Sequence, residues 1–283
     1  MTAPATPAVR PRGPAGPGRT QARIRQAVFY LPAVIVFVGG IVLWEVVVTA
    51  LGLRQFVLPR PSAIVTALID NWSGGRFPGL GVSALNTLIE SLGGLLIGTI
   101  VGVAVAFATA RFATARGVLL PIAVAANAVP IVAFAPLFNN WFGLLNPVSK
   151  MAMAAVLVFF PITANVTRGL VQVEPASVEL MRSYAASEWT ILRKVRIPNA
   201  LPYFFTALKV ATTLALIGAI IAEYFGGQNR VLGRVIVESA SALRFDVTWA
   251  AILLAAITGI VFYLVIVVLE RLFIPWHSSL RTD

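Results

Sequence analysis

The sequence predicts an all-α protein that crosses a lipid bilayer several times, and three observations lead to this fold class. First, 58% of the 283 residues are hydrophobic and 12% are charged, whereas soluble domains average roughly 45–50% apolar and about 25% charged residues. Second, the apolar residues gather in long runs, and a membrane-spanning helix needs about 20 residues. Third, the net charge of +11 comes from basic residues placed between these runs. Such placement is typical of loops that orient a membrane protein, so we expect no nucleic-acid partner.

Six runs are long enough to cross the bilayer, which predicts six transmembrane helices. They cover residues 28–51, 84–109, 118–141, 149–168, 205–225 and 248–271. The third run contains Pro121, Pro130 and Pro136. A membrane helix tolerates proline where neighbouring protein satisfies the freed carbonyl groups. This run therefore predicts a broken helix packed inside a bundle.

The second run carries a glycine at every fourth position, at Gly94, Gly98 and Gly102. Small residues at this spacing lie on one helix face and allow another helix to approach closely. The alternative is that they reflect only the general abundance of glycine in membrane helices. We expect tight packing, either within the chain or between subunits.

The two ends of the chain differ from the apolar runs. Residues 1–26 are rich in Pro, Gly, Ala and Arg and show no apolar period, so we expect a disordered, basic cytoplasmic tail. A cleaved signal peptide is the alternative, but the following apolar run exceeds the about 7–15 residues of a signal sequence. Residues 27–80 are expected to hold a retained first helix and a connecting segment. Residues 271–283 form the expected C-terminal tail.

The distribution of Lys and Arg predicts the orientation in the membrane. With six helices and the N-terminus inside, the inner segments carry 15 of the 22 basic residues and the outer segments carry seven. Inner loops of membrane proteins carry the excess of positive charge. We therefore expect a multi-pass membrane protein with both termini in the cytoplasm.

The longest polar stretch between two runs, residues 169–205, predicts an amphipathic helix in the cytoplasm. Glu174-Pro175 is typical of a helix start. Apolar residues then recur at steps of three or four, which indicates one stripe on a helix of about four turns: Val178, Met181, Ala185, Trp189 and Leu192. Pro198 and Pro202 are expected to end this helix. Such a helix either lies on lipid headgroups or docks into a groove of a partner protein, and the pattern alone favours neither.

This stretch resembles the EAA loop of the MetI-like permeases of binding-protein-dependent ABC importers. The loop pattern of that family has Glu-Ala-Ala, a later Gly, and prolines before the next span. Here the glutamate is Glu179, and Ser183, Pro198 and Pro202 also match. The sequence departs from the pattern where Leu180-Met181 replaces Ala-Ala, and where Ala185 replaces the usual Gly.

Three further stretches are similar to the nitrate/sulfonate/taurine subgroup of these permeases. They are residues 58–62 (LPRPS), 128–143 and 222–226 (AEYFG). The resemblance covers about residues 44–275 and implies a MetI-like core, an ABC type-1 transmembrane domain, at residues 81–270.

The resemblance also implies a location in the bacterial inner membrane, partners and a mechanism. Such permeases form a pore as a homodimer within the lipid bilayer, take solute from an extracytoplasmic solute-binding protein, and are driven by a cytoplasmic ABC ATPase dimer. The loop helix would seat in a cleft of the ATPase. The implied ATPase-coupling residues are Val178, Glu179, Met181, Arg182, Ser183, Ala185, Ala186, Trp189, Pro198 and Pro202.

The solute is less well defined than the mechanism. The subgroup implies a small organic or anionic solute, such as a sulfonate, nitrate or taurine. The alternative within the same importer class is a heterocycle, either a pyrimidine precursor of thiamine or a riboflavin-type compound.

The residues themselves argue against an enzyme. A phosphate-binding P-loop needs Gly-Lys-Ser/Thr, but none of the three lysines, Lys150, Lys194 and Lys209, follows a glycine. The chain has no cysteine and one histidine, His277 in the C-terminal tail, which leaves little for thiol, histidine or metal chemistry. We expect no catalytic residue, no metal and no cofactor on this chain, and we expect ATP and Mg to bind the partner ATPase.

Polar residues within the apolar runs are the candidates for lining a pore. They are Asn127, Asn139, Asn140, Thr212 and Glu223. Each has a structural alternative. The amides would satisfy the proline-broken backbone, and Thr212 would bond a carbonyl of its own helix. Glu223 would make a helix-packing or gate-closing hydrogen bond.

Two other classes of protein remain as alternatives. A secondary transporter acting alone would also contain broken helices, but the sequence shows neither repeated halves nor a membrane-embedded charge cluster. A membrane scaffold for cytoplasmic proteins would explain the loop, but not the polar third run.

Overall fold

The computed structural model describes residues 19–74, 78–112, 130–228 and 230–274, and every regular element in these ranges is a helix. The elements follow one another as α1 (Arg19–Ala50), α2 (Pro61–Asp70), α3 (Leu80–Arg111), η1 (Ile131–Phe134), α5 (Ala135–Phe142), α6 (Pro147–Val171), α7 (Pro175–Ser183), α8 (Glu188–Ile191), η2 (Leu192–Arg196), α9 (Ile197–Phe225), α10 (Leu232–Ser241) and α11 (Phe245–Phe273). The all-α class predicted from the sequence is confirmed.

Five helical segments of the described chain are long and apolar enough to cross a membrane. They are Leu31–Ala50, Leu80–Arg111, Pro147–Val171, Glu188–Phe225 and Phe245–Phe273. They correspond to the first, second, fourth, fifth and sixth expected runs. The third run, 118–141, lies outside the described residues up to position 129. Its described part forms the short helices η1 and α5, and Pro136 stands in the first turn of α5, as expected for a helix broken at proline.

The chain divides into two compact units, residues 1–53 and 54–283. In the first unit, α1 begins at Arg19, so residues 19–26 are helical rather than disordered as expected. The basic residues in this stretch extend the helix because Arg and Gln are good helix formers. Residues 1–18 lie outside the described residues. The apolar side chains of α1 from Leu31 onward are largely exposed, as a helix surrounded by lipid requires.

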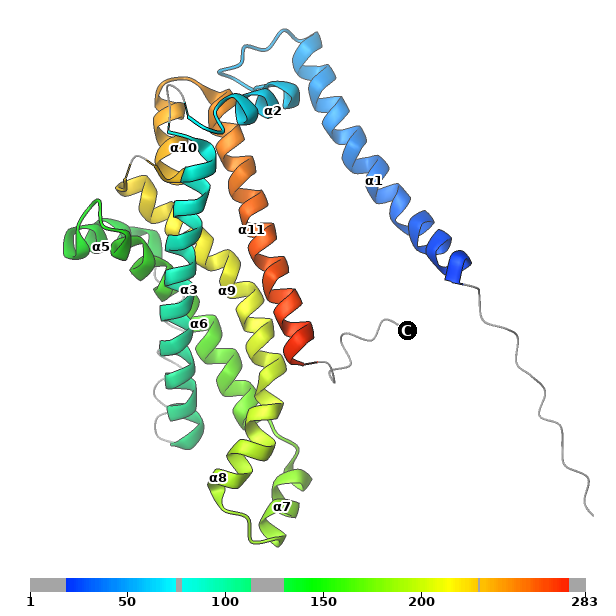
Figure 1. Cartoon of the computed structure of the whole chain (residues 1–283), viewed down its shortest axis with the longest axis vertical. Helices are drawn as coiled ribbons and strands as arrows, with labels where there is room; N and C mark the ends of the chain where they lie inside the picture. Colours follow the sequence, from blue (N-terminus) through cyan, green and yellow to red (C-terminus); the bar gives the residue numbers. More distant parts are fainter. Residues whose placement is uncertain (1–18, 75–77, 113–129, 229, 275–283) are drawn as a thin grey trace, which may run out of the picture. The chain divides into compact units, whose positions relative to one another are not determined.

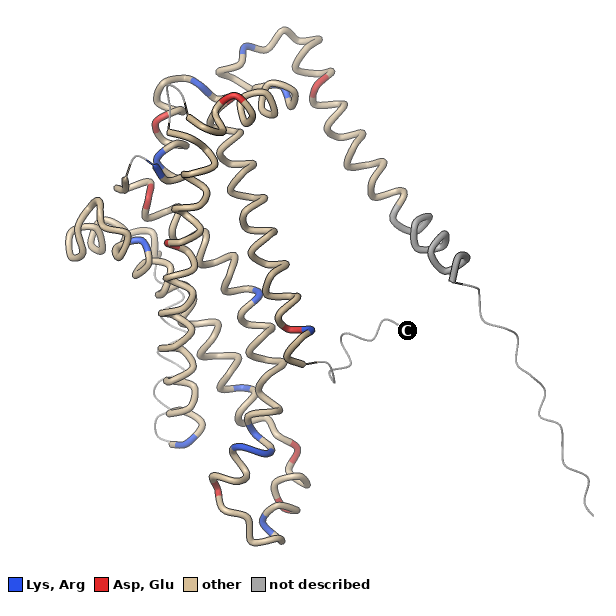
Figure 2. Tube along the Cα trace, in the orientation of Figure 1, with Lys and Arg blue, Asp and Glu red and all other residues tan. Residues whose placement is uncertain are grey.

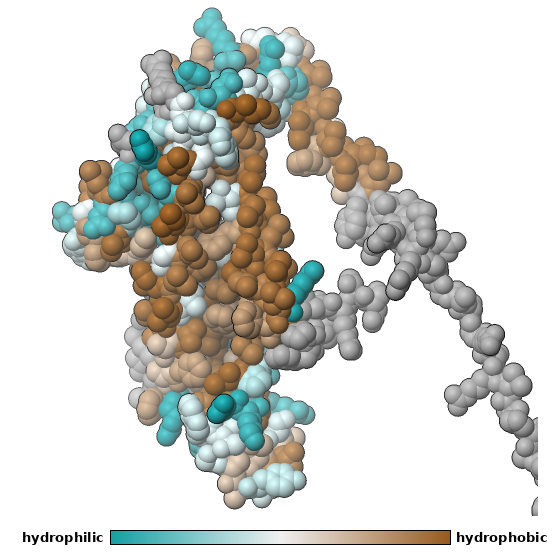
Figure 3. Space-filling model, viewed as in Figure 1, coloured by the Kyte–Doolittle hydropathy of each residue, from teal (hydrophilic) through white to brown (hydrophobic). Residues whose placement is uncertain are grey.

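The second unit is built on three closely packed helices, α3, α6 and α9 (Figure 1). Helices α3, α6 and α11 run toward the end of the unit that carries α7 and α8, and α9 runs back from it (Figure 1). Apolar side chains cover the middle of this bundle, and hydrophilic side chains lie at its two ends (Figure 3). This arrangement is that of a helix bundle in a bilayer.

The glycine row of α3 brings its backbone against α6. A Cβ atom added at Gly94 would lie 2.3 Å from the Cβ of Ala154, and one at Gly98 would lie 2.5 Å from the carbonyl oxygen of Ala155. Gly102 faces Ile162 in the same way, at 2.9 Å. The expected tight packing is confirmed, and its partner lies within the same chain.

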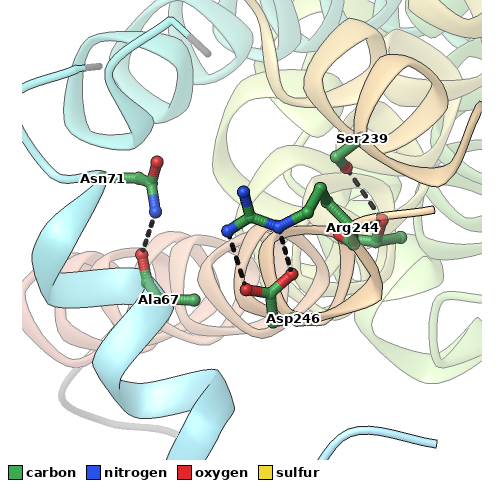
Figure 4. Close-up of polar contacts among 6 residues, drawn as sticks. Ala67, Asn71, Ser239, Arg244 and Asp246 are labelled. Carbon is green, nitrogen blue, oxygen red and sulfur yellow. Dashed lines mark hydrogen bonds and ion pairs between the residues drawn. The ribbon is translucent and has the colours of Figure 1, made fainter. Parts of the chain in front are cut away.

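Polar contacts fix the shorter helices at the end of the unit opposite α7 and α8 (Figure 4). Ser239 of α10 and Thr248 of α11 share a hydrogen bond of 2.8 Å. Arg244, in the turn between these helices, contacts Asp246 through two hydrogen bonds of 3.1 and 2.9 Å. The Asn71 side chain donates to Ala67 and so ends α2. The contacts of Ser239 and Arg244 thus stabilise the turn between α10 and α11.

Candidate functional site

The loop predicted to couple to a partner projects from one end of the second unit, between α6 and α9 (Figure 1). It contains two short helices, α7 and α8, so the expectation of one four-turn helix is wrong. The backbone of Ala185 has φ 52°, a left-handed conformation that ends a helix. The hydroxyl of Ser187 then accepts the amide of Thr190 and begins α8 as its N-cap, which is the usual role of serine there.

The two prolines do not end the helix either, contrary to expectation. Helix α8 continues through η2 into α9, and Pro202 lies inside α9. In η2 the chain adopts a π-helix, in which the amide of Ile197 bonds the carbonyl of Leu192. Pro198 follows directly in the first turn of α9. The wider π-turn accommodates a residue that has no amide hydrogen, so the helix passes the proline without a break.

Most of the predicted coupling residues face solvent. Val178, Met181 and Ala186 are half-buried, and Glu179, Arg182, Ser183 and Ala185 are exposed. Three large apolar or aromatic side chains of this segment are also exposed: Leu180 (57%), Tyr184 (77%) and Trp189 (68%). The turn at Ala185 separates Val178 and Met181 from Trp189, so the expected stripe does not form one continuous face.

An ion pair connects the two helices of this segment, and a hollow lies between the segment and the bundle. Arg182 and Glu188 form an exposed ion pair of 3.2 Å that joins α7 to α8. Glu188 and Trp189 also line a hollow of about 580 Å³ with Arg111, at the end of α3. Lys and Arg residues occur at this end of the unit, around α8, η2 and the end of α3 (Figure 2). The surface is therefore apolar and basic together.

Asn199, which the sequence analysis missed, ties the base of this segment to α6. Its side-chain amide donates to the carbonyl oxygens of Gly169 at 2.7 Å and Gln172 at 3.0 Å. These are carbonyls at the C-terminal end of α6, which lack partners within their own helix. A Cβ atom at Gly169 would lie 2.7 Å from the Cα of Ala200. The end of α6 and the start of α9 are thus joined as one piece.

A second group of polar residues is buried at the other end of the α9 span. We call Glu90, Asn139, Lys150 and Glu223 the buried polar cluster. The ammonium of Lys150 donates to the Asn139 side chain at 3.2 Å, to Ser149 at 2.9 Å and to the carbonyl of Leu144. A carboxylate oxygen of Glu223 accepts the backbone amide of Gly233 at 2.6 Å.

The predicted pore residues separate into different environments. Asn139 and Glu223 come together in the buried polar cluster, where Asn139 also approaches the carbonyl of Ala222 at 3.5 Å. Thr212 donates to the carbonyl of Lys209 in its own helix, as its structural alternative predicted. Asn140 is exposed, and Asn127 lies outside the described residues.

Glu90 and Lys150 belong to the cluster, although they were not among the predicted site residues. Their signal in the sequence is an ionisable residue inside or beside an apolar run, but the expected helix boundaries placed both near the membrane surface. No group of three or more His, Cys, Asp or Glu residues in the described ranges is arranged to hold a metal ion.

These features define the class of the protein, a multi-pass helical membrane protein with a helical loop projecting from one end of its bundle. Residues 94–278 match the family model of the binding-protein-dependent transport system inner membrane component. The chain belongs to this family and is a permease of an ABC importer. The resemblance seen in the sequence is confirmed.

Three curated relatives illustrate the range of this family. A probable ABC transporter permease protein of Haemophilus influenzae is 30% identical over 227 residues, which are 79% of this chain and 88% of the relative. The formylaminopyrimidine transport permease protein ThiX of Halalkalibacterium halodurans is 29% identical, over 88% of this chain and 97% of its own length. The taurine transport system permease protein TauC of Escherichia coli is 26% identical, over 84% of this chain and 86% of its own length.

Proposed function

We propose that the α7–α8 segment is the docking surface for the ABC ATPase and that it converts ATPase movement into movement of α6 and α9. The observation that carries this proposal is a projecting helical segment with exposed Leu180, Tyr184 and Trp189. Exposed aromatic and apolar side chains at the centre of a polar surface are typical of protein interfaces. ATP and Mg bind the partner, and this chain performs no catalysis and binds no cofactor.

The connection to the bundle supports transmission of force. Helix α8 continues into α9, and Asn199 holds the end of α6 to the start of α9. A displacement of α8 therefore moves two of the three central helices together. A helix on a lipid surface would need no such rigid connection, so this geometry favours a protein partner.

The remaining partners and the orientation follow from the same proposal. The α7–α8 end faces the cytoplasm, as do both termini, and the opposite end receives solute from an extracytoplasmic binding protein. A second copy of the chain completes the pore. The Lys and Arg residues around α8 and η2 (Figure 2) support this orientation, because positive charge is retained on the inner side.

For the solute, we propose a small organic compound of the sulfonate or taurine type. A pyrimidine-like heterocycle is the second candidate. ThiX and TauC match this chain to a similar degree, 29% over 249 residues and 26% over 244 residues, so sequence similarity supports both candidates. Equilibrium binding of both solute classes to the cognate binding protein separates the two.

The coupling proposal is tested with substitutions that change the surface of the segment. Glu179→Lys and Ala185→Asp are expected to reduce solute uptake at least tenfold in proteoliposomes containing the assembled importer. Ala185→Gly is the matched control, because glycine adopts φ 52° without strain and adds no charge. The measurements are uptake, ATPase stimulation and recovery of the ATPase with the permease. Normal uptake with full ATPase stimulation in both charged variants would show that the segment does not couple.

A further inference from the structure

The buried polar cluster contains more negative than positive charge. Glu90, Lys150 and Glu223 come from α3, α6 and α9, and their exposed fractions are 4%, 1% and 0%. One ammonium balances one carboxylate, which leaves the second carboxylate without a counter-charge among these three groups. An uncompensated charge in a low-dielectric interior is strongly unfavourable, so the cluster needs a further positive charge.

The contacts within the cluster indicate that this positive charge is a proton on one of the two carboxyl groups. The carboxyl groups of Glu90 and Glu223 are buried close enough to interact with each other and with Lys150. One oxygen of each, Oε2 of Glu90 and Oε1 of Glu223, is buried with no hydrogen-bond partner among the described residues. Two ionised carboxylates cannot bond each other, because both only accept hydrogen bonds. A proton on one of them supplies the missing donor.

The surroundings decide which of the two carries the proton. Glu223 accepts the amide of Gly233 at 2.6 Å and interacts with the hydroxyl of Thr87. Both groups stabilise the ionised form of Glu223. Oε2 of Glu90, by contrast, is buried without a donor among the described residues. Glu90 is therefore the donor and Glu223 the carboxylate.

The other charged groups nearby do not balance the site. On α10, Arg234 pairs with Glu238 at 2.8 Å, so these two ions neutralise each other. Tyr224 interacts with Glu223, and a neutral phenol adds no charge. The charge balance of the cluster is thus decided by Glu90, Lys150 and Glu223.

We propose that Glu90 and Glu223 form a binding site for a single proton, which is held on Glu90 and makes the cluster with Lys150 electrically neutral. The site clamps five helices. Glu90 lies on α3, Lys150 on α6 and Glu223 on α9, while Asn139 adds α5 and the amide of Gly233 adds α10. Loss of the proton leaves a second buried negative charge and loosens these contacts. The proposal does not depend on the coupling role of α7 and α8.

The first test is infrared spectroscopy of the purified full chain at mildly alkaline pH, where exposed carboxyl groups are ionised. We expect a carboxylic-acid C=O band in the wild type and its loss in Glu90→Gln. Further alkalinisation of the wild type should remove the same band. Absence of the band in the wild type overturns the proposal, and this measurement needs no variant.

The second test follows the thermal unfolding midpoint of the full chain as a function of pH. The wild type should lose stability as the pH rises from about 4.3, where a glutamate of the unfolded chain releases its proton, up to the range in which the infrared band disappears, and stability should level off above it. Glu90→Gln should abolish this loss, because its amide donates to Glu223 at every pH. Glu223→Gln should abolish it as well, because Glu90 is then the only carboxyl group of the pair and ionises as the counter-charge of Lys150.

Asp70→Asn is the matched control for the pH series, since Asp70 is an exposed acid at the end of α2. It should retain the wild-type pH dependence. If Glu90→Gln also retains this loss of stability, the proton-binding site is wrong.

Discussion

An ion pair between Lys209 and Glu270 joins α9 to α11. The ammonium donates to both carboxylate oxygens, at 3.0 and 2.9 Å. The side chains are 23% and 9% exposed. A largely buried ion pair contributes little net free energy to folding. Removal of one partner, however, leaves a buried charge and lowers the free energy of unfolding by several kcal/mol.

We therefore predict that Lys209→Met lowers the free energy of unfolding by about 3 kcal/mol. The double variant Lys209→Met/Glu270→Gln should recover most of this loss, because no charge then remains buried. Thermal unfolding in detergent measures both variants. A double variant less stable than Lys209→Met would show that the ion pair contributes more than the avoidance of an isolated charge.

Other residues show where sequence reasoning was limited at this scale. The left-handed backbone of Ala185 was not predictable, because alanine rarely adopts it and the apolar period continued across the turn. Lys150 appeared as a loop residue, since its burial depends on Asn139 and the carbonyl of Leu144, which only the folded chain brings near. Glu223 was a pore candidate whose structural alternative was a packing or gate-closing hydrogen bond, and it accepts the amide of Gly233.

At the scale of the elements, the packing of α3 against α6 depends on the absence of side chains at the glycine row. A Cβ atom at Gly98 would lie 2.5 Å from the carbonyl oxygen of Ala155 and 2.8 Å from Val158. Neither the backbone carbonyl nor the buried valine has room to move, because protein interiors are close-packed. Even one methyl group must therefore push the two helices apart.

We predict that Gly98→Ala destabilises the bundle by about 1–3 kcal/mol, the usual cost of overpacking. Gly39→Ala on α1 is the matched control, because no atom lies within 4 Å of a Cβ added there. It should leave the unfolding midpoint unchanged or raise it slightly, since alanine favours helix. Equal effects of the two substitutions would indicate that α3 and α6 are not in close contact.

The long helices were largely predictable because their apolar length has one physical cause, the thickness of the bilayer. The apolar runs therefore located α3, α6, α9 and α11. The break between α7 and α8 and the passage of the helix through Pro198 were not predictable. Both depend on hydrogen bonds, at Ser187 and in the π-turn of η2, that compete closely with a regular helix.

At the scale of the whole molecule, the absence of native cysteine makes the orientation directly measurable. Single cysteines at Tyr184, in the turn between α7 and α8, and at Ala242, before α11, occupy exposed positions at opposite ends of the second unit (Figure 1). Neither substitution disturbs a buried contact, so both chains should insert normally.

We predict that a membrane-impermeant maleimide labels Ala242→Cys in intact cells, and labels Tyr184→Cys only after the membrane is opened. A cysteine in the N-terminal tail, at Thr6, should behave like Tyr184→Cys. The cysteine-free wild type is the blank. The reverse labelling pattern would place α7 and α8 outside the cell, where no ATPase can reach them.

The helical segment from Glu188 to Phe225 is continuous from the α8 end of the second unit to the end of α9. It contains 38 residues, which corresponds to roughly 57 Å at 1.5 Å per residue. Trp189 lies at one end and Glu223 at the other, with no loop between them. A rotation of the helix at Trp189 is therefore expected to rotate the helix at Glu223 as well, apart from any local change in the π-helical stretch η2. We therefore expect the two ends of this permease to change conformation together, because one helix connects them.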